Sequence, residues 1–243
     1  MERNDFLDVL ATHLGERGLL REPDDMTRYE ADWAGDRLGM PLAVARPAST
    51  EEVVDTVRLC REHGVPMVPQ GGHSGLVAGA LPAAEGNELI ISLERMNRVR
   101  AIDPINFTMT VDAGCILENV KQAAAEHACE FPLALGAQGS CQIGGNIATN
   151  AGGLNVLRYG MMRQLVLGLE VVLPDGRLWN GMTELHKDNR GYPLKQLFLG
   201  SEGTLGIVTG AVLKLSPRAT QARTALLGLP SLEAVIELYG LAR

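Results

Sequence analysis

The residues best suited to chemistry lie in a glycine-rich stretch at 131–160. From Phe131 to Leu157 it carries no charged side chain, yet it holds six glycines among Gln, Ser, Asn and Thr. Dense glycine is used where the backbone takes positive φ or comes very close to another group. Small residues with exposed N–H groups can hold a phosphate or an aromatic ring. We predict a cofactor wall here and not a linker, because Ile143, Ile147 and Leu154 recur at spacings that bury a face.

A second glycine-rich turn, PQGGHSGL at 69–76, follows directly after an apolar run at 65–68. A turn in this position presents successive N–H groups to an anion, and a pyrophosphate suits it. The turn is not a Walker A loop, because no Gly-Lys pair occurs in the chain, and it lacks the G-x-G-x-x-G dinucleotide pattern. By itself it is a weak indicator of an anion site.

Composition and charge narrow the class of partner. The chain has 243 residues, 46% of them hydrophobic and 21% charged, which is typical of a globular protein of one or two domains. The net charge of −7 and pI near 5.3 argue against nucleic acid and against an anionic membrane surface. No apolar run is long enough to predict a membrane span. A small molecule is the expected partner.

Cysteine usage and the first residues predict a location. The cysteines form no C-x-x-C pair and no zinc spacing, so buried reduced thiols are expected at Cys60, Cys115, Cys129 and Cys141. Residues 1–20 read as an amphipathic helix whose acidic residues break any signal-peptide or transit-peptide pattern. These observations predict a reducing, cytoplasmic setting.

The first half of the chain predicts alternating strands and helices. A strand at 42–45 precedes a helix that Ser49 should cap, with Glu52 completing a capping box and the helix ending near 62. Helix, strand at 65–68 and glycine turn then form a βαβ-type arrangement. Strands at 89–93 and 108–112 and a helix at 116–128 are expected to follow.

The second half predicts a hairpin and a closing strand. A strand at 165–173 turns at 174–176 and returns through 177–179. A short helix should begin at Pro193, and a strand should reach Leu215. A strand at 225–229 and a helix at 231–241 would have no partners, so we expect the chain to be the front part of a longer protein.

The glycine blocks together resemble a known family. They are PQGGHSGL (69–76), LGAQGSCQIGGNIATNAGGLNVLRYG (135–160), LGLEVVLPDGR (167–177), KDNRGYPLKQLF (187–198) and GSEGTLGI (200–207). In this order they resemble the PCMH-type FAD-binding domain of the vanillyl-alcohol-oxidase superfamily, and most of all D-2-hydroxyglutarate dehydrogenases with their D-lactate dehydrogenase and glycolate oxidase relatives. The resemblance covers about residues 30–217.

The resemblance implies an α+β fold built from two α/β subdomains that hold FAD between them. An N-terminal helical segment at 1–37 would precede the FAD-binding domain at 38–217. The subdomains would span about 38–100 and 101–217, and residues 218–243 would begin a cap domain.

The resemblance also implies FAD-binding residues in three blocks. The first would wrap the pyrophosphate: Pro69, Gln70, Gly71, Gly72, His73, Ser74, Gly75 and Leu76. The second would line the ribityl and flavin-ring side: Pro132, Gly136, Gly139, Ser140, Gly144, Gly145, Asn146, Thr149, Asn150, Gly152 and Gly153. The third would close over the cofactor near its adenine half: Glu202, Gly203 and Ile207.

His73 departs from the family pattern. D-2-hydroxyglutarate dehydrogenases usually carry a small polar residue at this place, whereas berberine-bridge-type flavoenzymes have a GGH turn whose histidine bonds covalently to the flavin. Two alternatives therefore stay open. One is a sugar or lactone oxidase that carries covalent FAD at His73 and uses O2 directly, and the other is a non-catalytic module that binds FAD.

The activity implied by the resemblance is oxidation of a D-2-hydroxy acid to the 2-oxo acid by hydride transfer to flavin N5. Its implied partners are the 2-hydroxy acid, an electron acceptor such as an electron-transfer flavoprotein or a quinone, and a second copy in a homodimer. The catalytic base and divalent-metal ligands would lie beyond residue 243. No catalytic or metal residue is therefore assigned here, and the chain is expected to bind FAD yet to turn over little substrate.

Overall fold

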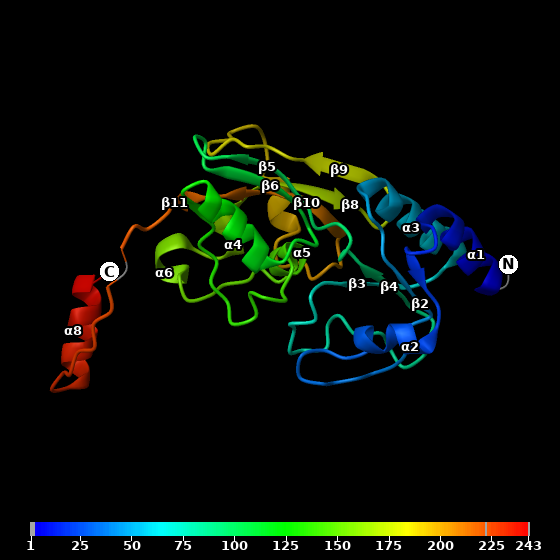
Figure 1. Ribbon diagram of the computed structural model, residues 1–243, viewed down its shortest axis with the longest axis horizontal. Coiled ribbons are helices and arrows are strands. Elements are labelled where there is room, and N and C mark those ends of the chain that lie inside the picture. Colours follow the sequence, from blue (N-terminus) through cyan, green and yellow to red (C-terminus); the bar gives the residue numbers. More distant parts are fainter. Residues whose placement is uncertain (1–2, 222, 243) are drawn as a thin grey trace.

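The computed structural model describes residues 3–221 and 223–242. Its first part forms one sheet with flanking helices (Figure 1). The elements are α1 (Arg3–Leu14), β1 (Leu19–Leu20), α2 (Pro23–Met26), the 3-10 helix η1 (Thr27–Tyr29), β2 (Ala43–Ala45), α3 (Thr50–His63), β3 (Met67–Gln70) and β4 (Leu89–Ser92).

The second part forms a larger sheet with α4 and α5 against one face (Figure 1). Its elements are β5 (Val99–Asp103), β6 (Thr108–Asp112), α4 (Leu117–Glu126), β7 (Cys129–Glu130), α5 (Ile143–Ala148), α6 (Val156–Tyr159), α7 (Met162–Leu165), β8 (Val166–Val172), β9 (Leu178–Gly181), the 3-10 helix η2 (Leu194–Leu197), β10 (Ile207–Lys214), β11 (Ser216–Pro217) and α8 (Leu232–Ala242).

The first sheet has the order β1-β2-β4-β3, with β2 and β3 both parallel to β4. The predicted βαβ arrangement is confirmed: β2, α3 and β3 form a crossover with β4 between the two strands. β1 lies inside the segment predicted to be purely helical, yet it pairs antiparallel with β2. The apolar face of α1 is buried as predicted, with Leu10 fully covered. Residues 1–37 therefore contribute directly to the first sheet.

Helix α3 begins at the predicted cap and ends at Gly64, whose φ of 66° is left-handed. The Ser49 side chain accepts a hydrogen bond from Glu52 N at 3.2 Å. The Glu52 carboxylate reaches Ala48 N at 2.7 Å, one residue before the N–H expected for a capping box. The side chains of Ser49 and Glu52 thus each accept a hydrogen bond from a backbone N–H at the start of α3.

Ser49→Ala should lower the free energy of unfolding by about 1 kcal/mol, because the N–H of Glu52 loses its acceptor at the helix end. Urea unfolding followed by circular dichroism measures the change. Ser49→Asp restores an acceptor and should stay close to the native midpoint. A Ser49→Ala midpoint equal to the native one would show that this cap contributes nothing.

The second sheet is antiparallel throughout, in the order β5-β6-β10-β8-β9. The predicted hairpin is confirmed, since β8 returns through β9 after the turn at 174–176. β5 was not predicted, because its residues are mostly half-exposed and show no clear alternation. The predicted subdomain boundary near residue 100 falls inside this strand.

The predictions for buried residues hold in α5 and fail beyond it. Ile143 and Ile147 are fully buried, whereas Leu154 is 91% exposed. Leu154 N donates to Ala134 O at 3.0 Å, which holds the loop against the 131–135 segment and turns the side chain outward. The apolar spacing therefore describes a helix only as far as Ala148.

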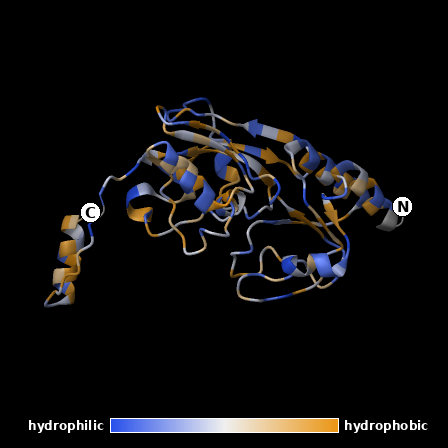
Figure 2. Ribbon diagram, viewed as in Figure 1, coloured by the Kyte–Doolittle hydropathy of each residue, from blue (hydrophilic) through white to orange (hydrophobic). Residues whose placement is uncertain are grey.

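The last residues lie apart from both sheets (Figure 1). The strand predicted at 225–229 is wrong, because within the described residues this segment pairs with no other strand. The helix predicted at 231–241 is confirmed as α8, which is rich in apolar residues (Figure 2). Several of its apolar side chains are exposed, such as Ile236 at 63%. Among the described residues, no helix combines the length and apolarity that crossing a membrane requires.

Candidate cofactor cleft

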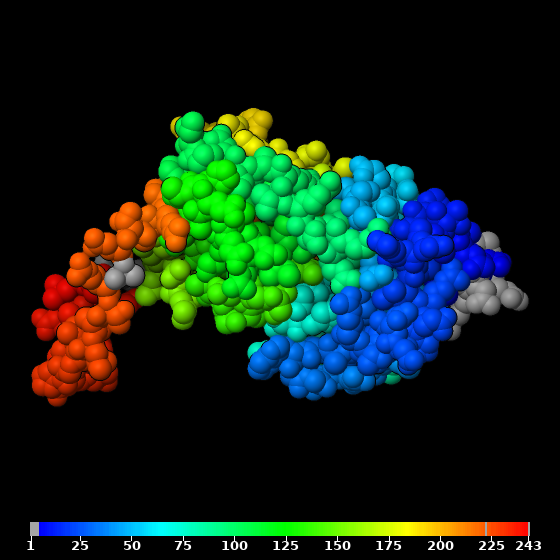
Figure 3. All heavy atoms as spheres, in the orientation of Figure 1, coloured from blue at the N-terminus to red at the C-terminus, as the bar shows by residue number. Residues whose placement is uncertain are grey.

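A cleft lies between the two sheets, where the first subdomain meets the 131–160 segment along a notch in the surface (Figure 3). Its empty volume is about 880 Å³, part of which is open to solvent. Ligand and cofactor sites occur preferentially between domains. The position of the cleft between the two sheets therefore makes it the candidate cofactor site.

The chain brings five segments to this cleft, at 69–80, 91–93, 113, 142–149 and 201–208. The ends of β3 and β4 form one wall, since Gln70 and Ile91 line it. Helix α5 forms the facing wall, and the loop before β10 closes one end through Glu202 and Gly203. The cleft thus lies beyond the carboxyl ends of parallel strands, a usual place for ligand sites in such sheets.

The two glycine-rich walls are in contact. A Cβ on Gly72 would lie 1.9 Å from the carbonyl oxygen of Ser140, and one on Gly71 would lie 3.7 Å from Gly145 Cα. At the closed end, a Cβ on Gly203 would lie 3.1 Å from Pro69 Cγ. Glycine is therefore required at Gly72 by the close approach of another backbone.

Four non-glycine residues in or near the cleft have left-handed backbone. The φ angles of His73, Ala78, Asn150 and Glu202 are 55°, 55°, 47° and 52°. Asn150 Oδ1 accepts from Arg163 N, and Glu202 N donates to Ala148 O, both at 2.9 Å. Such conformations cost free energy in non-glycine residues and gather at functional sites. One falls in each of the three blocks that the sequence singled out.

The cleft wall is neutral except for one carboxylate. Glu202 is the only charged residue among the described residues that line it. Within the described part of the chain, no backbone N–H from Gly72 to Gly75 donates to another protein atom. Such a turn presents an anion with backbone dipoles in place of cations. The remaining wall is mostly apolar and suits an aromatic ring.

Gln70 links the turn to its neighbours. Its side-chain Nε2 donates to Tyr29 O at 2.9 Å and to Ala80 O at 2.8 Å. Its Oε1 is buried and has no partner within the described residues, as is also true of Asn146 Oδ1. A buried acceptor without a partner is costly, and Gln70 belongs to the cleft wall, so its oxygen is suited to a ligand that brings a donor.

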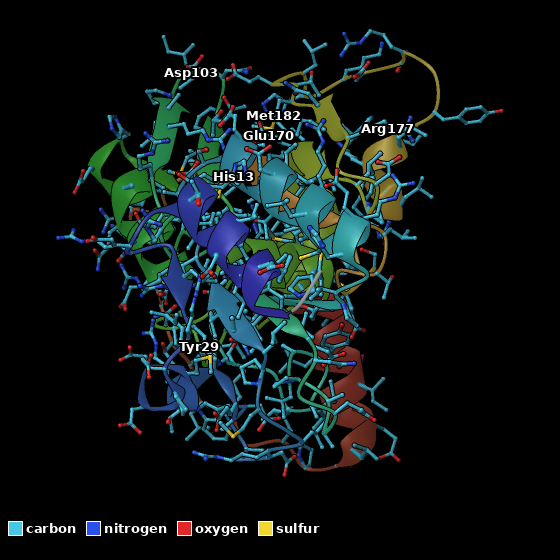
Figure 4. All side chains as sticks on the ribbon, turned by 90° about the vertical axis from the view of Figure 1, so that its right-hand side faces the viewer. His13, Tyr29, Asp103, Glu170, Arg177 and Met182 are labelled. Atoms are coloured by element: carbon cyan, nitrogen blue, oxygen red, sulfur yellow. The ribbon has the colours of Figure 1, made fainter. Side chains whose placement is uncertain are left out.

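His73 points away from the cleft. The centroid of its ring lies 5.7 Å from the ring centroid of Tyr29. Tyr29 lies in the lower half of the molecule as seen in Figure 4. Burial lowers the pKa of His73, and the hydrogen bond to the Ala31 backbone opposes this only in part. The imidazole does not line the cleft. This orientation does not favour a covalent bond between His73 and a ring bound in the cleft.

The structure divides the predicted FAD-binding residues into two groups. Those in the cleft wall are Pro69, Gln70, Gly71, Gly75, Gly144, Gly145, Thr149, Glu202, Gly203 and Ile207. Those behind or beside it are Gly72, His73, Ser74, Leu76, Pro132, Gly136, Gly139, Ser140, Asn146, Asn150, Gly152 and Gly153. Two of the second group make contacts between the loops that precede and follow α5: Asn155 Nδ2 donates to Pro132 O at 2.9 Å, and a Cβ on Gly153 would meet Ala134 O at 1.9 Å.

Sequence reasoning missed about half of the wall. The missed residues are Val77, Gly79, Ala80, Ile91, Leu93, Ala113, Gln142, Ala148, Ser201, Gly206 and Val208. Ile91, Leu93, Ala113 and Val208 are apolar residues of strands or strand ends, where they read as core. Gly79 and Gly206 could have been found, since each continues a glycine-rich block already identified.

The cysteines are buried as predicted. All of them are free thiols, and burial raises the pKa of Cys60 and of Cys115 to about 12. Within the described residues, no group of His, Cys, Asp and Glu is arranged to hold a metal ion.

Comparison with known proteins supports a flavin site. Residues 41–181 match a family model described as an FAD binding domain. The chain is 46% identical to D-2-hydroxyglutarate dehydrogenase of Danio rerio, over 92% of this chain and 42% of that protein. It is 43% identical to the Bos taurus enzyme, over 93% and 41%. The chain thus spans about two fifths of these relatives.

The fold also resembles solved structures of alkyldihydroxyacetonephosphate synthase. One has a TM-score of 0.79 at 23% identity and covers 89% of this chain and 41% of that one. This likeness supports the PCMH-type FAD-binding fold expected from the glycine blocks.

The prediction of a cytoplasmic location is wrong on this comparison. The relatives from Bos taurus, Danio rerio and Rattus norvegicus are named as mitochondrial proteins, and so is a D-lactate dehydrogenase relative from Schizosaccharomyces pombe. Buried free thiols could not separate the two compartments, because the burial of these cysteines is a property of the fold and not of its surroundings.

Proposed function

The chain belongs to the family of FAD-binding domains, and on that premise we propose that it is the FAD-binding part of an enzyme that oxidises a D-2-hydroxy acid to the 2-oxo acid. The observation that carries this proposal is the 43–46% identity to D-2-hydroxyglutarate dehydrogenases across more than nine tenths of the chain. The neutral, glycine-lined cleft fits the cofactor of such an enzyme.

In this proposal the turn at 71–75 binds the pyrophosphate through backbone N–H groups, which its lack of internal hydrogen bonds supports. Apolar residues such as Ile91 and Val208 cover ring faces and exclude water, while Gln70 Oε1 accepts from a donor of the cofactor. The remaining predicted contacts of the three blocks stay part of the proposal. Bound FAD would supply the hydride acceptor, and the chain's residues orient it.

The substrate groups belong to the part of the relatives that this chain does not match. We assign the carboxylate clamp, the base and any divalent-metal ligands to that part, because no His, Cys, Asp and Glu cluster lies in the described residues. The substrate class is a 2-hydroxyglutarate-like or lactate-like acid. An electron-transfer flavoprotein or a quinone is proposed as electron acceptor, and a homodimer as the assembly.

Anaerobic reduction of the bound flavin tests the proposal. The chain loaded with FAD should show the visible flavin band and bleach little with D-2-hydroxyglutarate. The longer protein that carries this chain should bleach with the D acid and not with the L acid. Rapid bleaching of the chain alone would overturn the assignment of the substrate groups. An FAD-loaded longer protein that no 2-hydroxy acid reduces would instead favour a non-catalytic module.

FAD should be held non-covalently, because the imidazole of His73 packs against Tyr29 and lies outside the cleft wall. Acid precipitation should release all of the flavin into the supernatant, where its fluorescence is measured. His73→Asn should keep its flavin, since asparagine tolerates left-handed backbone. Flavin fluorescence that stays with the precipitated native protein, and is absent from that of His73→Asn, would favour the covalent oxidase alternative.

A further inference from the structure

A polar network joins the two subdomains on the side of the second sheet that faces α3. Its centre is Glu170 on β8, whose Oε1 accepts from Thr50 Oγ1 at 2.8 Å, from Thr209 Oγ1 at 2.9 Å and from Arg100 Nη2 at 3.0 Å. Arg100 Nε also donates to Asp112 Oδ1 at 2.6 Å. Thr50 is the first residue of α3, beside which Glu170 lies (Figure 4). The network therefore connects a helix of the first subdomain to strands of the second.

The strands are shaped to bring these side chains together. Register shifts leave Arg100 of β5 and Thr209 of β10 at irregularities in the ladder. Bulges of this kind redirect side chains and are common beside functional sites. A Cβ on Gly210 would lie 2.9 Å from Arg100 Nη1, so glycine leaves room for the guanidinium across the sheet.

Both sides of the network lead to the cofactor cleft. On one side, α3 continues through Gly64 into β3 and the 71–75 turn. On the other side, Thr209 O accepts from Ala113 N at 3.0 Å, and Ala113 O accepts from Gly144 N at 2.7 Å. Ala113 and Gly144 both line the cleft. Glu170 is thus connected to each of the facing walls without touching the cleft.

We propose that Glu170 is a positioning residue that sets the distance between the two cleft walls and thereby the affinity for FAD. It acts through Thr50 on the pyrophosphate turn and through Thr209 on the α5 wall. The pKa of Glu170 supports an ionised clamp: burial alone would raise it, but hydrogen bonds from Arg100, Thr50 and Thr209 hold it below its usual value. The inference rests on FAD binding and not on the proposed oxidation.

The test is FAD affinity measured beside apoprotein stability. Glu170→Gln should weaken FAD binding about tenfold in fluorescence titrations, equivalent to about 1.4 kcal/mol. The apoprotein should remain folded under the titration conditions. Glu51→Gln is the matched control, because it removes the same charge from the exposed residue next to Thr50, and it should bind FAD as the native chain does.

Two milder variants test the same role of Glu170 if Glu170→Gln does not fold. Thr50→Val and Thr209→Val each remove one hydroxyl that reaches Glu170, and each should weaken FAD binding about threefold to fivefold by loss of one hydrogen bond to a charged group. Lower apoprotein stability with unchanged FAD affinity in these variants would overturn the proposal and leave a purely structural network. If the native chain takes up no FAD, the assignment of FAD as its cofactor is refuted. That result is distinct from a failure of the role proposed for Glu170.

Discussion

Gly72→Ala should yield protein that takes up at least a hundredfold less FAD than the native chain, a loss of about 2.7 kcal/mol or more. The added Cβ would lie 1.9 Å from Ser140 O and 3.0 Å from Cys141 Cα. Neither atom is the end of a flexible side chain, so the backbones of the two walls must separate. Absorbance of the flavin band after desalting measures the bound fraction.

Gly75→Ala is the control for folding in this experiment. It lies in the same turn, but its Cβ would meet no protein atom within 4 Å. Its thermal unfolding as apoprotein should match that of the native chain. Native-like FAD uptake by Gly72→Ala would mean that the two walls need not meet, and would remove the physical basis of the site described here.

Asp112→Ala should lower the free energy of unfolding by about 3–5 kcal/mol, the usual cost of breaking a buried ion pair from one side. The Asp112 side chain is 2% exposed and bonds Arg100 Nε at 2.6 Å and Arg98 N at 2.9 Å. Its removal leaves Arg100 Nε and the Arg98 N–H without their acceptor, although Arg100 Nη2 still donates to Glu170. The midpoint of urea unfolding measures this loss.

An exposed ion pair of the same chemistry provides the comparison. Asp175 and Arg177 are joined at 2.6 Å in the hairpin turn between β8 and β9, where solvent reaches both. Solvent-exposed pairs of this kind contribute little, so Asp175→Ala should unfold near the native midpoint. Equal midpoint shifts in the two variants would contradict the assignment of Asp112 to a stabilising buried pair.

Local signals in the sequence were sufficient for the regular elements. The Ser49 cap, the helix end near 62 and the hairpin turn at 174–176 each depend on a few neighbouring residues, so they could be predicted before the fold was known. β5 and the short β1 could not be predicted from local sequence, because each exists only through its pairing with a neighbouring strand. The strand expected at 225–229 failed for the same reason, as a strand needs a partner edge.

The residues of the candidate site were likewise predicted only in part. The glycine blocks identified both walls, because close backbone approach leaves only glycine at Gly72. Residues such as Ile91 and Ala113 were missed, since an apolar residue in a strand gives no sign of which face meets a ligand. The orientation of His73 also depended on contacts outside the turn, with Tyr29 and Ala31. Sequence alone predicted residues that lie on both walls of this cleft and left about half of the wall residues unidentified.

The scarcity of charge in the described cleft wall, where Glu202 is the one charged residue, has a consequence for the conditions under which the cofactor stays bound. A pyrophosphate that is held by N–H groups at hydrogen-bond distance depends on contacts far shorter than the screening length of about 8 Å in physiological salt. Neither lysine nor arginine lines the described wall, so few long-range attractions are available for dissolved ions to weaken. The affinity for FAD should therefore change little as ionic strength rises. The FAD-loaded protein should stay yellow when it is washed with buffer of high salt concentration.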